Sequence, residues 1–132
     1  MNNLIKYFVI LTAALYFTGS CSSAPAIDDK LTAPELVQKA QEASDHNRYK
    51  TAVYYYEAIL EKFPHDLAYT CEAEYEIAFI KYKQKKYSDA KTGFNALLRR
   101  YESPDMELLP QHFKILSVNV LEKIEAALKK TN

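Results

Sequence analysis

An internal repeat constrains the fold of this 132-residue chain more than any other feature of its sequence. The segment NRYKTAVYYYEAILEKF, residues 47–63, aligns with KKYSDAKTGFNALLRRY, residues 85–101, at an offset of 38 residues. Five aligned positions carry similar side chains: Tyr49 with Tyr87, Ala52 with Ala90, Tyr56 with Phe94, Ile59 with Leu97, and Phe63 with Tyr101. A unit that recurs with a period of about 20–50 residues indicates stacked supersecondary units.

From residue 33 the apolar residues follow the spacing of a helix and not the alternation of a strand. Thr32 is a candidate N-cap, with Pro34 in the first turn and Glu35 at the third position of a capping box. Pro64 ends the second predicted helix. The chain has only two glycines, which favours helices over a turn-rich β fold. The sequence therefore predicts an all-α protein.

Both copies of the repeat resemble the second helix of a tetratricopeptide repeat, and Pro64 stands where that family has its inter-repeat proline. The preceding helices fit less closely, through Leu36 and Ala40 in the first unit and through AEYEIAFIKYKQKKY, residues 73–87, in the second. The resemblance implies an α-solenoid of two helical hairpins, at residues 33–66 and 71–104. The alternative is an unrelated four-helix bundle.

A further helical stripe follows the second hairpin. Pro110 is the predicted start of a last helix with the apolar residues Phe113, Leu116, Val120, Ile124, Ala127 and Leu128. Two hairpins alone leave the flank of the second exposed, and repeat arrays normally carry a cap there. We expect residues 109–130 to be this capping helix, which completes one helical domain over residues 33–130. Its stripe is more apolar than a cap facing water requires, so a partner is expected to cover the remainder.

The first twenty residues have the composition of a secretory signal peptide. Lys6 precedes the uncharged segment YFVILTAALYFT, residues 7–18. As a helix this segment would span about 18 Å, which is less than a bilayer core of about 30 Å. Residues 1–20 are therefore expected to be removed. A hydrophobic anchor that stays in place is the alternative.

The segment Thr18-Gly19-Ser20-Cys21 resembles the lipobox of bacterial lipoproteins, although Thr18 replaces the leucine that this family prefers. The resemblance implies cleavage after residue 20 and acylation of Cys21, which would hold the chain on a membrane through its acyl chains. Residues 22–32, SSAPAIDDKLT, lack an apolar period. We expect residues 21–32 to be a lipidated cysteine and a flexible tether. In the sorting rule of enterobacterial lipoproteins, an Asp after the cysteine retains the protein at the inner membrane. If this rule applies, Ser22 and Ser23 imply the outer membrane, with the domain in the periplasm.

Composition and spacing argue against several classes of function. The 17 Lys and Arg residues balance the 17 Asp and Glu residues, so the basic excess typical of nucleic-acid-binding proteins is missing. His46, His65 and His112 have no partner at metal-ligand spacing, and two glycines are too few for a phosphate loop. Cys71 has no evident base beside it. We expect no cofactor, no metal, no nucleic-acid partner and no enzymatic activity.

The remaining candidate site is a surface for protein partners, implied by the tetratricopeptide resemblance. In that family the first helix of each hairpin lines a concave groove that binds a peptide or protein segment. The corresponding residues are Val37, Gln41, Ser44 and Asp45 in the first unit and Tyr75, Phe79, Tyr82 and Lys83 in the second. Aromatic side chains on a rigid helix make good binding anchors. Alternatively, the three aromatic residues pack beneath the last helix.

The combination of lipobox, short tether and repeats is similar to BamD-type lipoproteins, which belong to the machinery that inserts β-barrel proteins into the outer membrane. Their repeat pattern, Y-x-x-A-x-x-x-(Y/F)-x-x-(I/L)-L-x-x-(F/Y)-P, matches residues 49–64, although this chain is shorter than is usual for them. The resemblance implies a lipid-anchored scaffold that binds a subunit or client of that machinery. The alternatives are a periplasmic adaptor of a transporter or cell-wall complex, and an accessory subunit that regulates an enzyme.

Overall fold

The computed structural model describes residues 26–104 and 106–130, in which every regular element is a helix. The elements are α2 (Ala33–Asp45), α3 (Tyr49–Lys62), α4 (Leu67–Lys83), α5 (Tyr87–Arg100), the short 3₁₀ helix η1 (Met106–Leu108) and α6 (Gln111–Lys129). The predicted all-α class is confirmed for this part of the chain. The predicted signal peptide and Cys21 lie outside the described residues.

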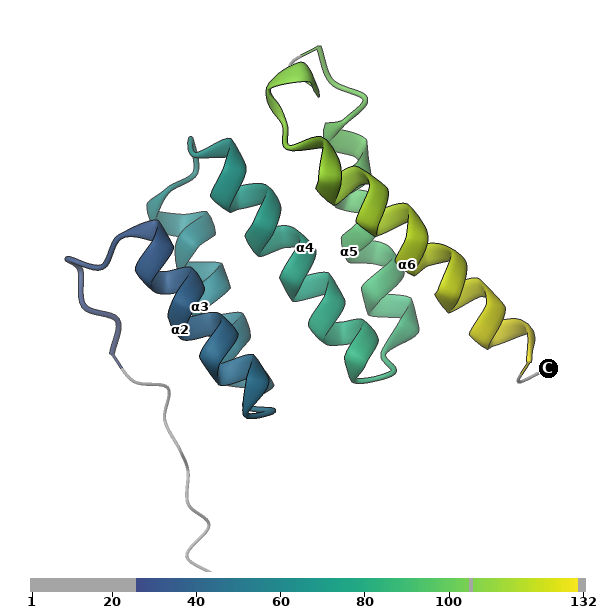
Figure 1. The fold of residues 1–132 in the computed structure, drawn as a ribbon, viewed down its shortest axis with the longest axis horizontal. Coiled ribbons are helices and arrows are strands. Elements are labelled where there is room, and N and C mark those ends of the chain that lie inside the picture. The colour runs from purple at the N-terminus through teal and green to yellow at the C-terminus, as the bar shows by residue number, and fades with distance from the viewer. Residues whose placement is uncertain (1–25, 105, 131–132) are drawn as a thin grey trace, which may run out of the picture.

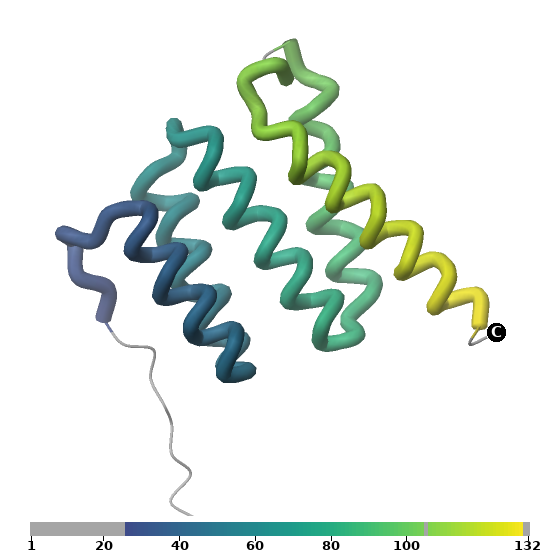
Figure 2. The backbone as a smooth tube through the Cα atoms, viewed as in Figure 1, coloured from purple at the N-terminus to yellow at the C-terminus, as the bar shows by residue number. Residues whose placement is uncertain are grey.

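The five α-helices form two antiparallel hairpins followed by a single helix. Helix α2 packs on α3, α4 packs on α5, and α3 joins the two hairpins through its contacts with α4. Figure 1 shows α2, α4 and α6 in a near layer, with α3 and α5 behind them. The tube in Figure 2 shows the second hairpin set beside the first, with α6 as the last member of the row. Packing mainly between neighbouring units is the α-solenoid-like arrangement.

The 38-residue offset of the sequence recurs in the backbone. Two residues beyond the ends of α2 and α4, the backbone adopts a left-handed conformation, at Asn47 with φ of 57° and at Lys85 with φ of 60°. In both turns the next residue donates its N–H across the helix end, from Arg48 to Ala43 at 2.8 Å and from Lys86 to Lys81 at 2.9 Å. These bonds satisfy carbonyl groups that a helix end otherwise leaves unpaired. The α2–α3 and α4–α5 turns therefore have the same local backbone structure.

The start of α2 has the predicted capping box. The backbone N–H of Thr32 donates to Glu35 Oε2 at 2.9 Å, and the Thr32 hydroxyl donates to the same oxygen at 2.6 Å. A second cap begins α4, where the side chain of Asp66 accepts from the backbone N–H of Tyr69. Such caps satisfy N–H groups that the first turn leaves unpaired.

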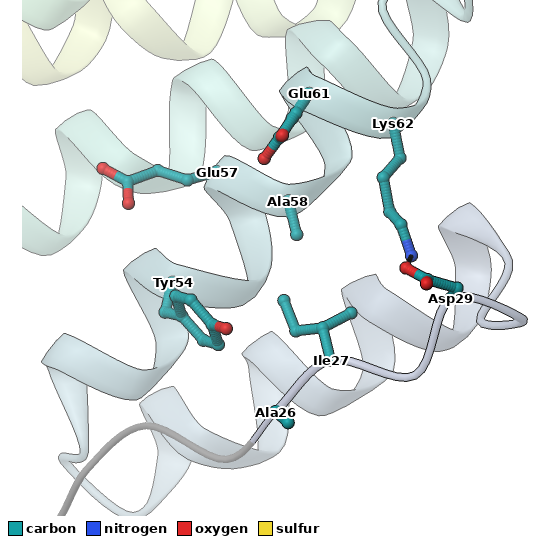
Figure 3. Close-up of a pocket in the computed structure, with 8 residues that line it drawn as sticks. All are labelled: Ala26, Ile27, Asp29, Tyr54, Glu57, Ala58, Glu61 and Lys62. Atoms are coloured by element: carbon teal, nitrogen blue, oxygen red, sulfur yellow. Dashed lines mark ion pairs between the residues drawn. The ribbon is translucent and has the colours of Figure 1, made fainter.

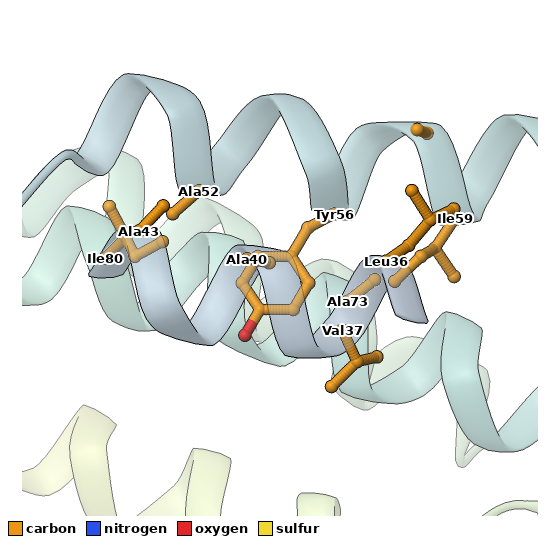
Figure 4. Close-up of a cluster of buried hydrophobic side chains, with 10 residues drawn as sticks. Leu36, Val37, Ala40, Ala43, Ala52, Tyr56, Ile59, Ala73 and Ile80 are labelled. Atoms are coloured by element: carbon orange, nitrogen blue, oxygen red, sulfur yellow. The ribbon is translucent and has the colours of Figure 1, made fainter. Parts of the chain in front are cut away.

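Two apolar clusters form the core, one for each hairpin. The first surrounds Tyr56 between α2, α3 and α4, where small residues such as Ala40 and Ala52 allow the helices to approach closely (Figure 4). The second surrounds Phe94 and joins α4, α5 and α6. Tyr56 and Phe94, which the repeat aligns, are both fully buried. Large residues at matching positions thus fill the centre of each unit.

The register of α6 differs in part from the predicted stripe. Val120 and Ile124 are buried as expected, but Leu116 and Leu128 are 40% and 42% exposed. Their place on the buried side is taken by Ser117, which is fully buried. A small side chain permits close packing there, and the apolar pattern could not identify it because serine is polar.

Two hydroxyl groups, on Tyr56 and Ser117, are buried in the described part of the chain without a hydrogen-bond partner. An unsatisfied buried polar group typically destabilises the folded state by about 1–3 kcal/mol. We therefore expect Tyr56→Phe and Ser117→Ala each to raise the free energy of unfolding by about 1 kcal/mol in urea titrations. Tyr54→Phe, at a half-buried position of α3, is the matched control. A loss of stability in either variant would show that the hydroxyl has a partner in solution.

Candidate protein-binding face

The near layer of the structure brings together several of the predicted binding residues. Helices α2 and α4 are linked by two polar contacts across this layer. Gln41 Nε2 donates to Glu72 Oε1 at 3.4 Å, and Lys83 Nζ donates to Ser44 Oγ at 2.7 Å. We call the surface formed by the near sides of α2, α4 and α6 the near face. Gln41, Ser44 and Lys83 therefore lie together on it, as the sequence predicts.

Lys83 also joins the polar and aromatic parts of the near face. Its Nζ atom lies 5.3 Å from the ring centroid of Tyr49 and 5.5 Å from that of Phe79. Cations at such distances are attracted by the negative face of an aromatic ring. The lysine is thus held by a hydroxyl and two rings, which fixes a long side chain that would otherwise be mobile.

The aromatic residues of α4 form a continuous stack. The ring centroids of Tyr75 and Phe79 are 5.7 Å apart, as are those of Phe79 and Tyr82. Tyr75 also contacts Phe94 at 5.6 Å and Phe113 of α6 at 5.5 Å. The stack therefore ties the near face to the second core cluster.

Burial divides the predicted binding residues into two groups. Val37, Ser44 and Tyr75 are only 9%, 8% and 6% exposed. Val37 packs in the first cluster, Lys83 contacts Ser44, and α6 covers Tyr75. These side chains offer a partner almost no surface. Tyr75 therefore packs beneath the last helix, which was the alternative to a binding role. Phe79 and Tyr82 are half-buried, and Asp45 is exposed at the end of α2.

Sequence reasoning missed two carboxyl groups on the same face. Glu72 and Glu76 of α4 are half-buried, and burial raises the pKa of both, while His112 opposes the shift for Glu72 and Lys83 for Glu76. Burial also raises the pKa of the Tyr56 hydroxyl, and the charges of these two glutamates add to that shift. Their spacing could have identified them, since positions 72, 76, 79 and 83 follow one side of a helix.

The raised pKa of Glu76 makes stability depend on pH. A carboxyl whose pKa is higher in the folded state binds its proton more readily there, so stability falls as pH rises from its ordinary value of 4.5 through the raised one. Glu76→Gln removes this loss. We expect the variant to be more stable than the unsubstituted chain at pH 7, with a difference that shrinks as the pH approaches about 4. Glu57→Gln, on the exposed side of α3, controls for the loss of a charge. A difference that grows on acidification would contradict this assignment.

The segment before α2 lies against α3, where the sequence predicts a flexible tether. Lys62 Nζ is 3.2 Å from Asp29 Oδ1 and donates to the backbone oxygen of Asp28 at 3.3 Å. Ile27 packs against the first core cluster. A cavity of about 380 Å³ separates the segment from α3 beside Tyr54 and Ala58 (Figure 3). Residues 26–32 thus belong to the folded unit, which shortens the part of the chain that can act as a tether.

Other candidate features of the described residues have ordinary structural surroundings. Cys71 is fully buried, and burial raises the pKa of its thiol, which favours the protonated and less nucleophilic form. In residues 26–104 and 106–130, no cluster of three or more His, Cys, Asp or Glu side chains is arranged to hold a metal ion. None of the described helices has the length and apolar character needed to cross a membrane.

Comparison with known proteins finds one related sequence, for which no activity is described. No family model matches the chain, and no solved structure matches it. The chain is 29% identical over 127 residues to an uncharacterized protein of Treponema pallidum (strain Nichols). The alignment covers 94% of this chain and 51% of that protein, so the chain spans about half the length of the curated relative it matches.

Proposed function

We propose that this protein is a lipid-anchored scaffold that binds protein partners in the cell envelope, in the assembly of outer-membrane β-barrel proteins. The observation that carries this proposal is the near face. The two hairpins have the same turn geometry, and their first helices, α2 and α4, lie side by side. Two hydrogen bonds join these helices. This is the arrangement expected if the hairpins are tetratricopeptide repeats of the BamD type.

The near face has the properties of a preorganised binding surface. Lys83 is held by Ser44 and by two aromatic rings, and Phe79 is stacked between Tyr75 and Tyr82. Side chains that are fixed before binding lose little conformational freedom on binding, which leaves more of the contact energy for affinity. In this account Phe79 and Tyr82 are the apolar anchors, while Glu72 and Glu76 select a cationic side chain of the partner.

The proposed location of the protein follows from acylation of Cys21. Two acyl chains would bind stably to a bilayer, because each buried CH₂ contributes about 0.8 kcal/mol. The domain would then lie in the periplasm at the outer membrane.

Affinity purification in mild detergent tests the proposal. The unsubstituted chain is expected to retain a subunit of the β-barrel assembly machinery, identified by mass spectrometry. Phe79→Ala should reduce that recovery strongly, and Tyr54→Ala on α3 should leave it unchanged, provided circular dichroism shows that both variants are folded. Recovery of a transporter or a cell-wall complex instead would replace the assembly role with that of a periplasmic adaptor. Equal recovery with both variants would exclude the near face as the binding surface.

A further inference from the structure

Three chain segments lie in a row along one end of the molecule. The α2–α3 turn, the α4–α5 turn and the last residues of α6 follow one another along the lower end in Figure 1. Lys83 near the end of α4 reaches Ser44 near the end of α2, and Lys91 near the start of α5 lies 3.8 Å from Glu125 of α6. We call this the basic end, for the charges that it carries.

Exposed cations gather at the basic end. They are Arg48 and Lys50 around the first turn, Lys83, Lys85 and Lys86 around the second, and Lys129 and Lys130 at the end of α6. Segments 45–50, 81–91 and 125–130 hold only three carboxylates, Asp45, Asp89 and Glu125. Within residues 26–104 and 106–130, none of the seven cations forms an ion pair. At the opposite end, the described residues of segments 28–35, 61–66 and 99–107 together include seven carboxylates and four Lys or Arg residues. Although the chain has no net charge, its basic residues are thus concentrated at one end and its acidic residues at the other.

The N-terminal segment runs toward the basic end. Asp29 lies beside Lys62, at the last residue of α3, whereas Ala26 and Ile27 lie beside Tyr54 and Ala58 (Figure 3). Followed back from residue 29 to residue 26, the chain therefore passes along α3 toward the start of that helix, which lies at the basic end.

The length of the remaining chain links Cys21 to the same end. Five residue steps separate Cys21 from Ala26, and they extend at most about 17 Å. The part of α3 that lies between Tyr54 and the first residue of the helix is only about 7.5 Å long. Cys21 can therefore reach beyond the basic end, toward which the chain runs from residue 29 to residue 26.

We propose that the basic end docks on an anionic bilayer surface, an inference that rests on the proposed acylation of Cys21. Basic side chains close to anionic headgroups strengthen membrane attachment, and the attraction decays within a Debye length. The anchor brings the basic end to that distance, and the positive charges then fix its orientation. The helices stand on the membrane with their ends toward it, so the near face points sideways and stays open to a protein partner.

Hydrogen exchange of the full acylated chain in vesicles tests this inference. One preparation contains phosphatidylcholine alone, and the other contains phosphatidylcholine mixed with phosphatidylglycerol. At a salt concentration of about 0.1 M, we expect amide exchange at residues 46–48 and 84–86 to slow several-fold in the anionic vesicles only. Exchange in the α3–α4 turn should be the same in both. At about 1 M salt, the slowing should disappear.

Charge reversal supplies the matched variants. Lys85→Glu with Lys86→Glu should abolish the slowing, whereas Lys30→Glu with Arg99→Glu, the same charge change at the opposite end, should preserve it. Equal exchange in both vesicles, or slowing that survives reversal at the basic end, would overturn the inference. Loss of a co-purified protein on reversal, without any effect of lipid charge, would also overturn it and assign this end to an acidic protein. If the purified chain carries no acyl group, the anchor on which this inference rests is absent, and the proposed function fails with it.

Discussion

Replacing Phe94 by alanine is expected to lower the free energy of unfolding by about 3–5 kcal/mol. The side chain is fully buried in the cluster that joins α4, α5 and α6, and its ring lies 5.6 Å from that of Tyr75. Truncation removes the apolar contacts and leaves a cavity that the surrounding helices fill only in part. Small domains have a total stability of about 5–15 kcal/mol, so a loss of this size lowers the urea midpoint substantially.

Ile115→Ala is the control for this experiment. Ile115 lies on α6 but is 61% exposed, so its truncation should change stability by no more than about 0.5 kcal/mol. Urea unfolding followed by far-ultraviolet circular dichroism measures both variants. Similar losses for the two would contradict the packing described for the second cluster.

Replacing Cys21 by alanine is expected to abolish lipid attachment completely. The thiol of Cys21 is the group that the lipobox resemblance assigns to acylation, and no other side chain replaces it in that chemistry. Intact-mass measurement of the unsubstituted protein should show a chain that begins at residue 21 and carries acyl groups. The variant should retain residues 1–20 and carry none.

Cys71→Ala tests whether this effect is specific to Cys21. Cys71 is fully buried, so its replacement should leave the acylated mass pattern in place. An unsubstituted protein that has the mass of all 132 residues would contradict the assignment and favour a retained hydrophobic anchor.

The local signals in the sequence predicted most of the helices. The capping box at Thr32 and the stop at Pro64 depend on neighbouring residues, and both are where the sequence places them. The turns at Asn47 and Lys85 were harder to predict in detail, because neither position carries the glycine that usually marks a left-handed helix end. The orientation of α6 could not be predicted from apolar spacing alone, since the buried side includes Ser117.

The candidate site depends more on tertiary contacts. Gln41, Ser44 and Lys83 occupy repeat positions, and the structure places them where α2 and α4 contact each other. The same positions include Tyr75, which α6 buries, and they omit Glu72 and Glu76. The docking of residues 26–32 rests largely on Ile27 and the Asp29–Lys62 ion pair, which the tether composition does not reveal.

Photo-crosslinking in living cells tests the scaffold account most directly. A photoreactive amino acid replaces Gln41, which is exposed on the near face, or Glu57, which is exposed on α3. We expect the probe at position 41 to form a membrane-associated adduct with a subunit of the β-barrel assembly machinery, and the probe at position 57 to form none. No adduct at position 41, or the same adducts at both positions, would contradict the claim that the near face binds this partner.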